Sequence, residues 1–187
     1  MADARPGAVT LRNNPVTLAG PEIKAGATAP DFAALDNGLQ PVKLSGAHGK
    51  VIVLSSVPSL DTPVCDTETR RFNQEAGKLG GNVEVWTVSM DLPFAQKRWC
   101  GEAGVSHRVL SAYADEKFGE DWGVLIKAKP LRRVLLPRER ALLDLDGALA
   151  AVDHLPLDLG AGPDCRLPGL DLRFAARGVG LPLRLCE

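Results

Sequence analysis

Residues 51–65, in the first half of the chain, read VIVLSSVPSLDTPVC. A short apolar run in this stretch is followed directly by the start of a helix. Residues 51–57 are apolar and rich in β-branched side chains, and Pro58 ends the run, so a buried central strand is favoured over a helix. Residues 83–88 (VEVWTV) alternate and predict a second strand, and residues 63–79 carry a helical pattern. Strand, helix and strand in this order predict a βαβ unit with parallel strands.

Cys65 is the residue of this stretch that carries chemistry. Pro63 suits the first helical position, so Thr62 becomes the N-cap and Cys65 lies at position N3. The N3 side chain folds back toward the N-cap, so sulfur and hydroxyl share one space with the free N–H groups of the helix. We therefore expect a thiol pKa lowered from about 8.5 toward neutrality. A lone cysteine is more often a small buried hydrophobe, but this N-cap arrangement favours a reactive thiol.

Further elements are expected on both sides of the βαβ unit. Two β-prone pieces flank Asn13-Asn14-Pro15 and predict a hairpin over residues 9–18. A helix is expected at 93–100, with Asp91 or Leu92 as its cap and Gly101 closing it. Other expected elements are strands at 109–113, 134–136 and within 141–152, and a short helix at 116–122.

Composition limits the class of protein. A chain of 187 residues that is 45% hydrophobic and 24% charged is long and apolar enough for one ordinary domain with or without an extension. The net charge of -1 gives no reason to expect nucleic acid or a membrane as a partner. The first residues show no signal-peptide pattern, so we expect a cytoplasmic protein, in which a disulfide is more often catalytic than structural. The four cysteines are too few for a disulfide scaffold and form no zinc pattern.

Two motifs resemble those of a known family. The pattern P-x-x-x-T-x-x-C at residues 58–65 is similar to the active-site motif of the peroxiredoxins, and the full string PSLDTPVC resembles their bacterial thiol peroxidase branch. The string MDLPFAQKRWCG, residues 90–101, resembles the same branch, and the likeness covers roughly residues 9–130. Shorter stretches that match this branch are NPVTL (residues 14–18) and RFN (residues 71–73).

The resemblance implies a thioredoxin-like α/β fold with an N-terminal β-hairpin and a central mixed sheet flanked by helices. Cys65 would be the peroxidatic cysteine, whose thiolate attacks the peroxide and becomes a sulfenic acid. Thr62 would hydrogen-bond the peroxide, and Pro58 would shield the sulfenate from water. Cys100 would be the resolving cysteine, which forms a Cys65–Cys100 disulfide that thioredoxin then reduces.

The residues themselves support the role of Cys100 only in part. Cys100 ends a predicted helix before Gly101, and a fraying helix end would let two cysteines on different helices meet. Such movement is needed because a disulfide requires Cα atoms within about 7 Å. A buried helix-end residue without a redox role is the alternative.

The implied activity is that of a thioredoxin-dependent peroxidase acting on hydrogen peroxide and organic hydroperoxides, as a homodimer and without a cofactor or metal. Two other functions stay open. The chain could be a thioredoxin-fold redox-sensing or binding module with little peroxidase turnover. A disulfide oxidoreductase is the third candidate, but the sequence lacks the C-x-x-C motif that this chemistry uses.

The family's active-site arginine, which belongs to an Arg-Ala-Val stretch, has no clear counterpart. Arg140-Ala141-Leu142 is the nearest match and Arg133-Val134-Leu135 the second. A turn pattern at residues 145–147 supports Arg140, whereas Pro137 and Asp144 interrupt the expected strand. A solvated surface arginine is the alternative for Arg140.

The end of the chain has an unusual composition. The last 57 residues contain no Ser, Thr, Asn, Gln, Lys, Ile, Met, Trp or Tyr. We predict a peroxiredoxin domain over residues 9–155 and a compositionally biased tail over 156–187, either disordered or produced by a shifted reading frame. Cys165 and Cys186 lie in this tail without a supporting motif and are interpreted as incidental thiols.

Overall fold

A computed structural model describes residues 4–127 except 12, 13, 25, 77, 79 and 80, and after them residues 129, 131, 135, 138–143, 149–152, 171–172 and 183–184. From residue 138 onward the description concerns the backbone alone. Several residues and segments singled out in the sequence lie outside this part of the chain: Asn13, Arg133, Pro137, Asp144, the turn pattern at 145–147, Cys165, Cys186, and most of the expected strand at 134–136 and of the tail at 156–187.

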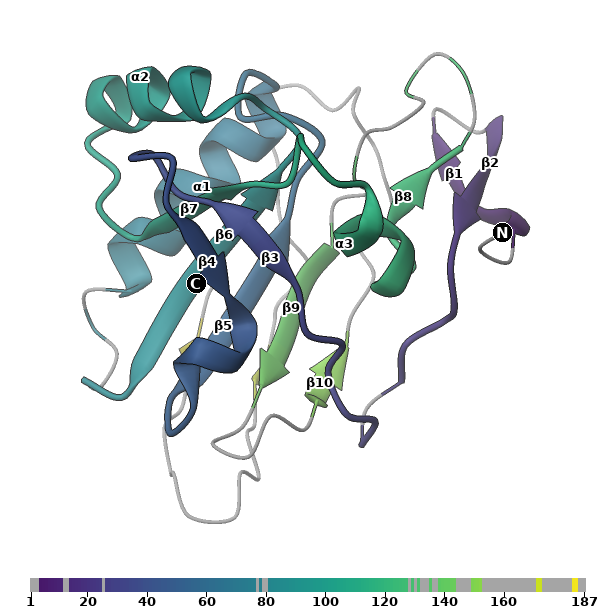
Figure 1. Ribbon diagram of the computed structural model, residues 1–187, viewed down its shortest axis with the longest axis horizontal. Helices are drawn as coiled ribbons and strands as arrows, with labels where there is room; N and C mark the ends of the chain where they lie inside the picture. Colours follow the sequence, from purple (N-terminus) through teal and green to yellow (C-terminus); the bar gives the residue numbers. More distant parts are fainter. Residues whose placement is uncertain are drawn as a thin grey trace.

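A mixed sheet of seven described strands forms the centre of the fold (Figure 1). The β5, β6 and β7 strands are parallel, and each of the other neighbouring pairs is antiparallel. The predicted βαβ unit is confirmed, because β5 and β6 pair in parallel and α1 lies between them in sequence. The strands in sheet order are β10 (Leu149–Val152), β9 (Arg138–Leu143), β5 (Val51–Ser56), β6 (Val83–Ser89), β7 (Arg108–Ser111), β3 (Ala33–Leu35) and β4 (Pro41–Lys43).

A second, smaller sheet contains the N-terminal hairpin. Its strands are antiparallel, and the pairing of Leu11 with Asn14 confirms the predicted hairpin. In Figure 1 this hairpin lies at the right, on the side of the molecule away from α2. The smaller sheet comprises β1 (Ala4–Leu11), β2 (Asn14–Ala19) and β8 (Leu125–Ile126), and a further short pair joins β11 (Asp171–Leu172) to β12 (Leu183–Arg184).

The helices follow the sequence pattern with one correction. The predicted end of α2 at Gly101 is wrong, because the helix continues to Ala103 and its C-cap is Gly104. Gly104 adopts a left-handed φ of 65°, and its N–H bonds the carbonyl of Cys100, an arrangement that favours glycine. Cys100 therefore lies inside the last helical turn rather than at the helix end. The helices are α1 (Pro63–Ala76), α2 (Pro93–Ala103), α3 (Lys117–Asp121) and the 3-10 turn η1 (Leu44–Ala47).

Buried apolar side chains divide into a main core and two smaller clusters. The main core is built on aromatic contacts in which Phe32 packs edge-on against Trp86, Phe118 and Trp122. A separate cluster joins the start of α1 to α2 and β7, and both described cysteines belong to it. This cluster, called the cysteine cluster below, comprises Val57, Leu60, Cys65, Trp99, Cys100 and Val109.

The close approach of Gly123, just after α3, to Pro21, just after β2, can be tested by substitution. The φ of Gly123 is +63°, and a Cβ placed there would lie 1.9 Å from the carbonyl oxygen of Pro21. Gly123→Ala therefore combines a left-handed backbone with a backbone clash, and we expect a loss of about 3 kcal/mol or more in the free energy of unfolding. Urea unfolding followed by tryptophan fluorescence measures this loss.

Gly101→Ala is the matched control for this substitution. Gly101 is exposed within α2, and a Cβ there meets nothing within 4 Å. Alanine at this position is expected to leave stability unchanged or raise it by up to about 1 kcal/mol. A loss below about 1 kcal/mol for Gly123→Ala would contradict the close approach of Gly123 to Pro21.

Candidate active site

The loop after β5 delivers Cys65 to the first turn of α1. The backbone N–H of Val57 bonds the Val88 carbonyl at 2.9 Å, which extends the β5–β6 pairing to the start of the loop. Pro58 follows and is buried. Because α1 begins at Pro63, Thr62 stands at the N-cap position, and Cys65 is the third helical residue with 0% exposure. The structure thus brings together Pro58, Thr62 and Cys65 as the sequence motif requires.

Hydrogen bonds fix Thr62 in this position. Its backbone carbonyl accepts from the Asp66 N–H at 2.9 Å, which is the first helical bond of α1. Its hydroxyl donates to the Ser59 carbonyl at 3.0 Å, and its N–H lies 3.2 Å from the same oxygen. The Thr62 side chain also hydrogen-bonds the Cys65 sulfur, which confirms that hydroxyl and sulfur share one space.

The prediction of a lowered thiol pKa is wrong for this arrangement. The pKa of Cys65 is raised to about 11, chiefly by burial in the cysteine cluster, and the nearby carboxylates of Glu68 and Asp91 act in the same direction. Hydrogen bonds from the Thr62 side chain and the Ser59 backbone oppose this shift but do not outweigh it. Loss of solvent disfavours the thiolate more than a helix N-terminus favours it. A nearby positive charge is therefore needed to make the sulfur anionic at neutral pH.

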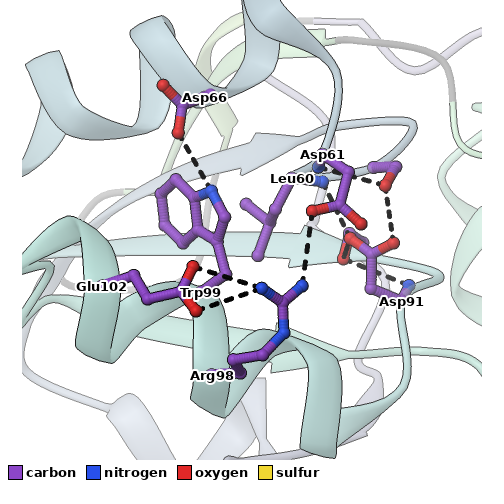
Figure 2. A network of polar contacts seen from close by, with 9 residues as sticks. Leu60, Asp61, Asp66, Asp91, Arg98, Trp99 and Glu102 are labelled. Carbon is purple, nitrogen blue, oxygen red and sulfur yellow. Dashed lines mark hydrogen bonds and ion pairs between the residues drawn. The ribbon is translucent and has the colours of Figure 1, made fainter.

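Asp91 holds the loop that carries the motif, a role that sequence reasoning missed. Its Oδ1 accepts from the Ser59 hydroxyl at 2.7 Å, and its Oδ2 accepts from the Leu60 N–H at 2.8 Å (Figure 2). The Ser89 hydroxyl donates to the same Oδ2 at 2.8 Å. The helix cap is Leu92, so the Asp91 side chain is free to fix this loop to the end of β6. The sequence signal that could have identified this role is the position of Asp91 in the second motif, MDLPFAQKRWCG (residues 90–101).

The helices that carry the two cysteines are tied to each other. The indole N–H of Trp99 on α2 donates to Asp66 Oδ1 on α1 at 2.9 Å, as Figure 2 shows. Arg70 bonds Asp66, lies over the Trp99 ring at 5.5 Å, and donates to the Ala103 carbonyl at 3.0 Å. A more exposed ion pair joins Arg98 to Asp61 at 3.8 Å and contributes little to the stability of the fold. These contacts oppose separation of α1 from α2.

Cys100 lies in the same apolar cluster as Cys65, and both are free thiols. Its side chain is 8% exposed, and burial raises the pKa of its thiol. The Nδ2 group of Asn37 lies 3.6 Å from its sulfur and acts as donor. The predicted cysteine pair is therefore placed on two adjoining helices, with different polar partners for each sulfur.

The sequence candidate Arg140 lies in β9, beside the strand that leads to the motif. The register pairs Leu54 with Ala141 and Ser56 with Arg138, with an irregularity between these two pairs. Arg140 belongs to that irregular stretch, next to the carboxyl end of β5. The backbone thus brings two arginines, Arg138 and Arg140, to the edge of the sheet at which the motif begins.

Two further findings apply only to the described residues. Within them no group of three or more His, Cys, Asp and Glu side chains is arranged to hold a metal ion. None of the helices in that part of the chain has the length and apolar character to cross a membrane.

Comparison with known proteins identifies the family. Residues 24–159 match the protein family described as Redoxin. The chain belongs to the Redoxin family. This Redoxin chain is 48% identical over 148 residues to the thiol peroxidase of Bacillus subtilis (strain 168), a match that covers 79% of the chain and 86% of that relative. It is 53% identical over 120 residues to the thiol peroxidase of Halalkalibacterium halodurans, which covers 64% of the chain and 72% of the relative.

Solved structures agree with this assignment of the Redoxin chain. A peroxiredoxin-like protein from Aquifex aeolicus superposes with a TM-score of 0.74 at 42% identity, covering 79% of this chain and 85% of that one. A thiol peroxidase from Chromobacterium violaceum, 21% identical with a TM-score of 0.69, shares the fold over 79% of this chain and 85% of its own. The predicted resemblance to bacterial thiol peroxidases, the thioredoxin-like fold and the assignment as a peroxidase enzyme are confirmed.

Proposed function

We propose that this Redoxin chain reduces hydrogen peroxide and organic hydroperoxides through Cys65. The observation that carries the proposal is the placement of the buried Cys65 in the first turn of α1, hydrogen-bonded to Thr62, after a loop that begins with the buried Pro58. The thiolate attacks the terminal peroxide oxygen, the O–O bond breaks, and the alkoxide leaves as an alcohol after taking a proton. Cys65 becomes a sulfenic acid, Thr62 orients the peroxide, and Pro58 limits access of water to the sulfenate.

Cys100 completes the cycle in this proposal. Its thiol displaces the sulfenic hydroxyl, so that a Cys65–Cys100 disulfide forms and one water leaves with the thiol proton. Membership of both cysteines in one cluster on adjoining helices supports this pairing. Thioredoxin then reduces the disulfide by exchange, so the electrons come from thiols and no cofactor takes part. We place the enzyme in the cytoplasm, as a homodimer.

One observation favours a redox-sensing module with little turnover as the second candidate. The described surroundings of Cys65 raise its pKa to about 11, which leaves little thiolate at neutral pH. A sensor tolerates slow oxidation, whereas a peroxidase needs a reactive thiolate. The rate of the first oxidation step therefore separates the two functions.

A disulfide map after one equivalent of hydrogen peroxide tests the proposal. We expect a single Cys65–Cys100 disulfide in the full chain, identified by peptide mass analysis, and its loss when thioredoxin, thioredoxin reductase and NADPH are added. A disulfide that involves Cys165 or Cys186 instead would refute the proposed pairing. Oxidation without continued NADPH consumption would favour the sensor.

We further propose that Arg140 supplies the positive charge that Cys65 requires. Its place on β9 beside the end of β5 supports this role. In Arg140→Gln the thiol loses this positive charge, so absorbance of the thiolate at 240 nm should develop at a higher pH than in the unmodified chain. Peroxide reduction at pH 7 by the unmodified chain should exceed that of the variant on the order of 10²-fold or more.

Arg138→Gln is the matched control, since Arg138 lies on the same strand opposite Ser56. We expect it to keep the thiolate signal of the unmodified chain. If Arg138→Gln shifts the titration and Arg140→Gln does not, the charge comes from Arg138 and the assignment of Arg140 is wrong.

A further inference from the structure

The side-chain amide of Asn37 links a turn of the sheet to the proposed resolving cysteine. Its Nδ2 donates to the Cys100 sulfur at 3.6 Å, a usual length for a hydrogen bond to sulfur, across 63 residues of sequence. The Oδ1 atom of the same amide is buried and has no hydrogen-bond partner within the described part of the chain. Within the described part of the chain the amide of Asn37 thus bonds to sulfur through its nitrogen, and its unpaired buried oxygen calls for a functional explanation.

The turn that carries Asn37 is held independently of α2. Asp36 Oδ1 accepts from the backbone N–H groups of Gly38 at 2.7 Å and Gln40 at 2.9 Å, and the Asp36 N–H bonds the Gln40 carbonyl at 3.0 Å. Leu39 in this turn has a φ of 65°, a left-handed conformation that strains a non-glycine residue and needs such support.

The sheet beneath the turn anchors it to β7. Leu35, at the end of β3, pairs with Ser111 of β7, and β3 also pairs with β4 along its length. The position of Asn37 is therefore set by the sheet and does not depend on whether the last turn of α2 is helical.

Disulfide formation requires Cys100 to leave this contact. The Cys65 sulfur is held by Thr62 and by the Ser59 backbone, whereas the Cys100 sulfur is held by Asn37. A disulfide brings two sulfurs to about 2.05 Å. Cys100 lies inside the last turn of α2, so movement of its sulfur to bonding distance of Cys65 disturbs that turn, whereas Asn37 is held by the sheet. The Asn37–Cys100 hydrogen bond is therefore expected in the reduced chain and not in the oxidised one.

We propose that Asn37 is a positioning residue that holds the Cys100 thiol in α2 and stabilises the reduced state against the Cys65–Cys100 disulfide. This inference rests on the proposed resolving role of Cys100. Asn37 exchanges no proton in the step, in which the Cys65 sulfenic acid and the Cys100 thiol give the disulfide and water. Its hydrogen bond keeps the disulfide easier to reduce than it would otherwise be.

The reduction potential of the disulfide tests this role. In Asn37→Ala and Asn37→Ser we expect the equilibrium constant for disulfide formation to rise about 3- to 10-fold, the range of one neutral hydrogen bond. The potential then becomes more negative by about 15–30 mV. The full chain is equilibrated in buffers of oxidised and reduced dithiothreitol, trapped with an alkylating reagent, and analysed by mass.

Gln40→Ala is the matched control, because Gln40 is exposed in the same turn and its side chain donates to the Gly38 carbonyl at 3.4 Å rather than to a cysteine. It should leave the potential unchanged. An equal shift in Gln40→Ala, or an unchanged potential in both Asn37 variants while the disulfide still forms, overturns the role of Asn37. If the unmodified chain forms no Cys65–Cys100 disulfide, the proposed function fails instead.

Discussion

Replacing Cys65 with serine is expected to reduce peroxide consumption to the rate of the reaction without enzyme, a loss on the order of 10³-fold or more. The reason is that a thiol sulfur accepts an oxygen atom from the peroxide and releases it as water when a disulfide forms. A serine hydroxyl is not oxidised in this way. The measurement is hydrogen peroxide consumption with thioredoxin, thioredoxin reductase and NADPH. Serine is close in size to cysteine and leaves the buried site filled.

A double variant, Cys165→Ser with Cys186→Ser, serves as the control for general thiol chemistry. Both cysteines lie in the compositionally biased tail, and we expect this variant to keep the rate of the unmodified chain. Peroxide consumption by Cys65→Ser at the rate of the unmodified chain would exclude Cys65 as the reacting thiol.

Replacing Cys100 with serine is expected to separate the two halves of the cycle. The first oxidation of Cys65 should proceed at its usual rate, and the sulfenic acid should accumulate because the described residues of the cysteine cluster then contain no second thiol. Continued turnover should fall about 10²-fold, since an external thiol at micromolar concentration replaces an internal thiol whose effective concentration is millimolar. Stopped-flow tryptophan fluorescence measures the first step, and NADPH consumption measures turnover.

Trapping of the sulfenic acid gives the control for this variant. A reagent specific for sulfenic acids should label Cys65 in Cys100→Ser and label the unmodified chain weakly. Full thioredoxin-linked turnover in Cys100→Ser would show that another thiol resolves the sulfenic acid, and both the pairing and the role of Asn37 would then be wrong.

Local sequence signals were sufficient for much of the fold. The β-branched run at residues 51–57, the proline at the start of α1 and the Asn-Asn-Pro turn predicted β5, the first helical turn and the N-terminal hairpin. Each of these signals acts over a few neighbouring residues, so no tertiary information was needed. The position of Thr62 and Cys65 at the start of α1 followed from the same local rules.

Properties that depend on burial could not be read from the same residues. The pKa of Cys65 was predicted in the wrong direction, because the desolvation that raises it comes from side chains of α2 and β7, distant in sequence. The end of α2 was misplaced because Gly101 is tolerated in the helix, while the left-handed cap at Gly104 satisfies the carbonyl of Cys100.

Long-range polar contacts are the part that only three-dimensional packing decides. Asp91 reaches back 31 residues to the Leu60 N–H, and Asn37 reaches forward 63 residues to the Cys100 sulfur. Neither contact leaves a periodic or local signature, since each depends on where sheet order places a turn or a loop. The motif thus determines which sulfur is proposed to react and which residues adjoin it. The surroundings that control the charge of this sulfur, and the position of its proposed disulfide partner, depend on elements that the sheet brings together.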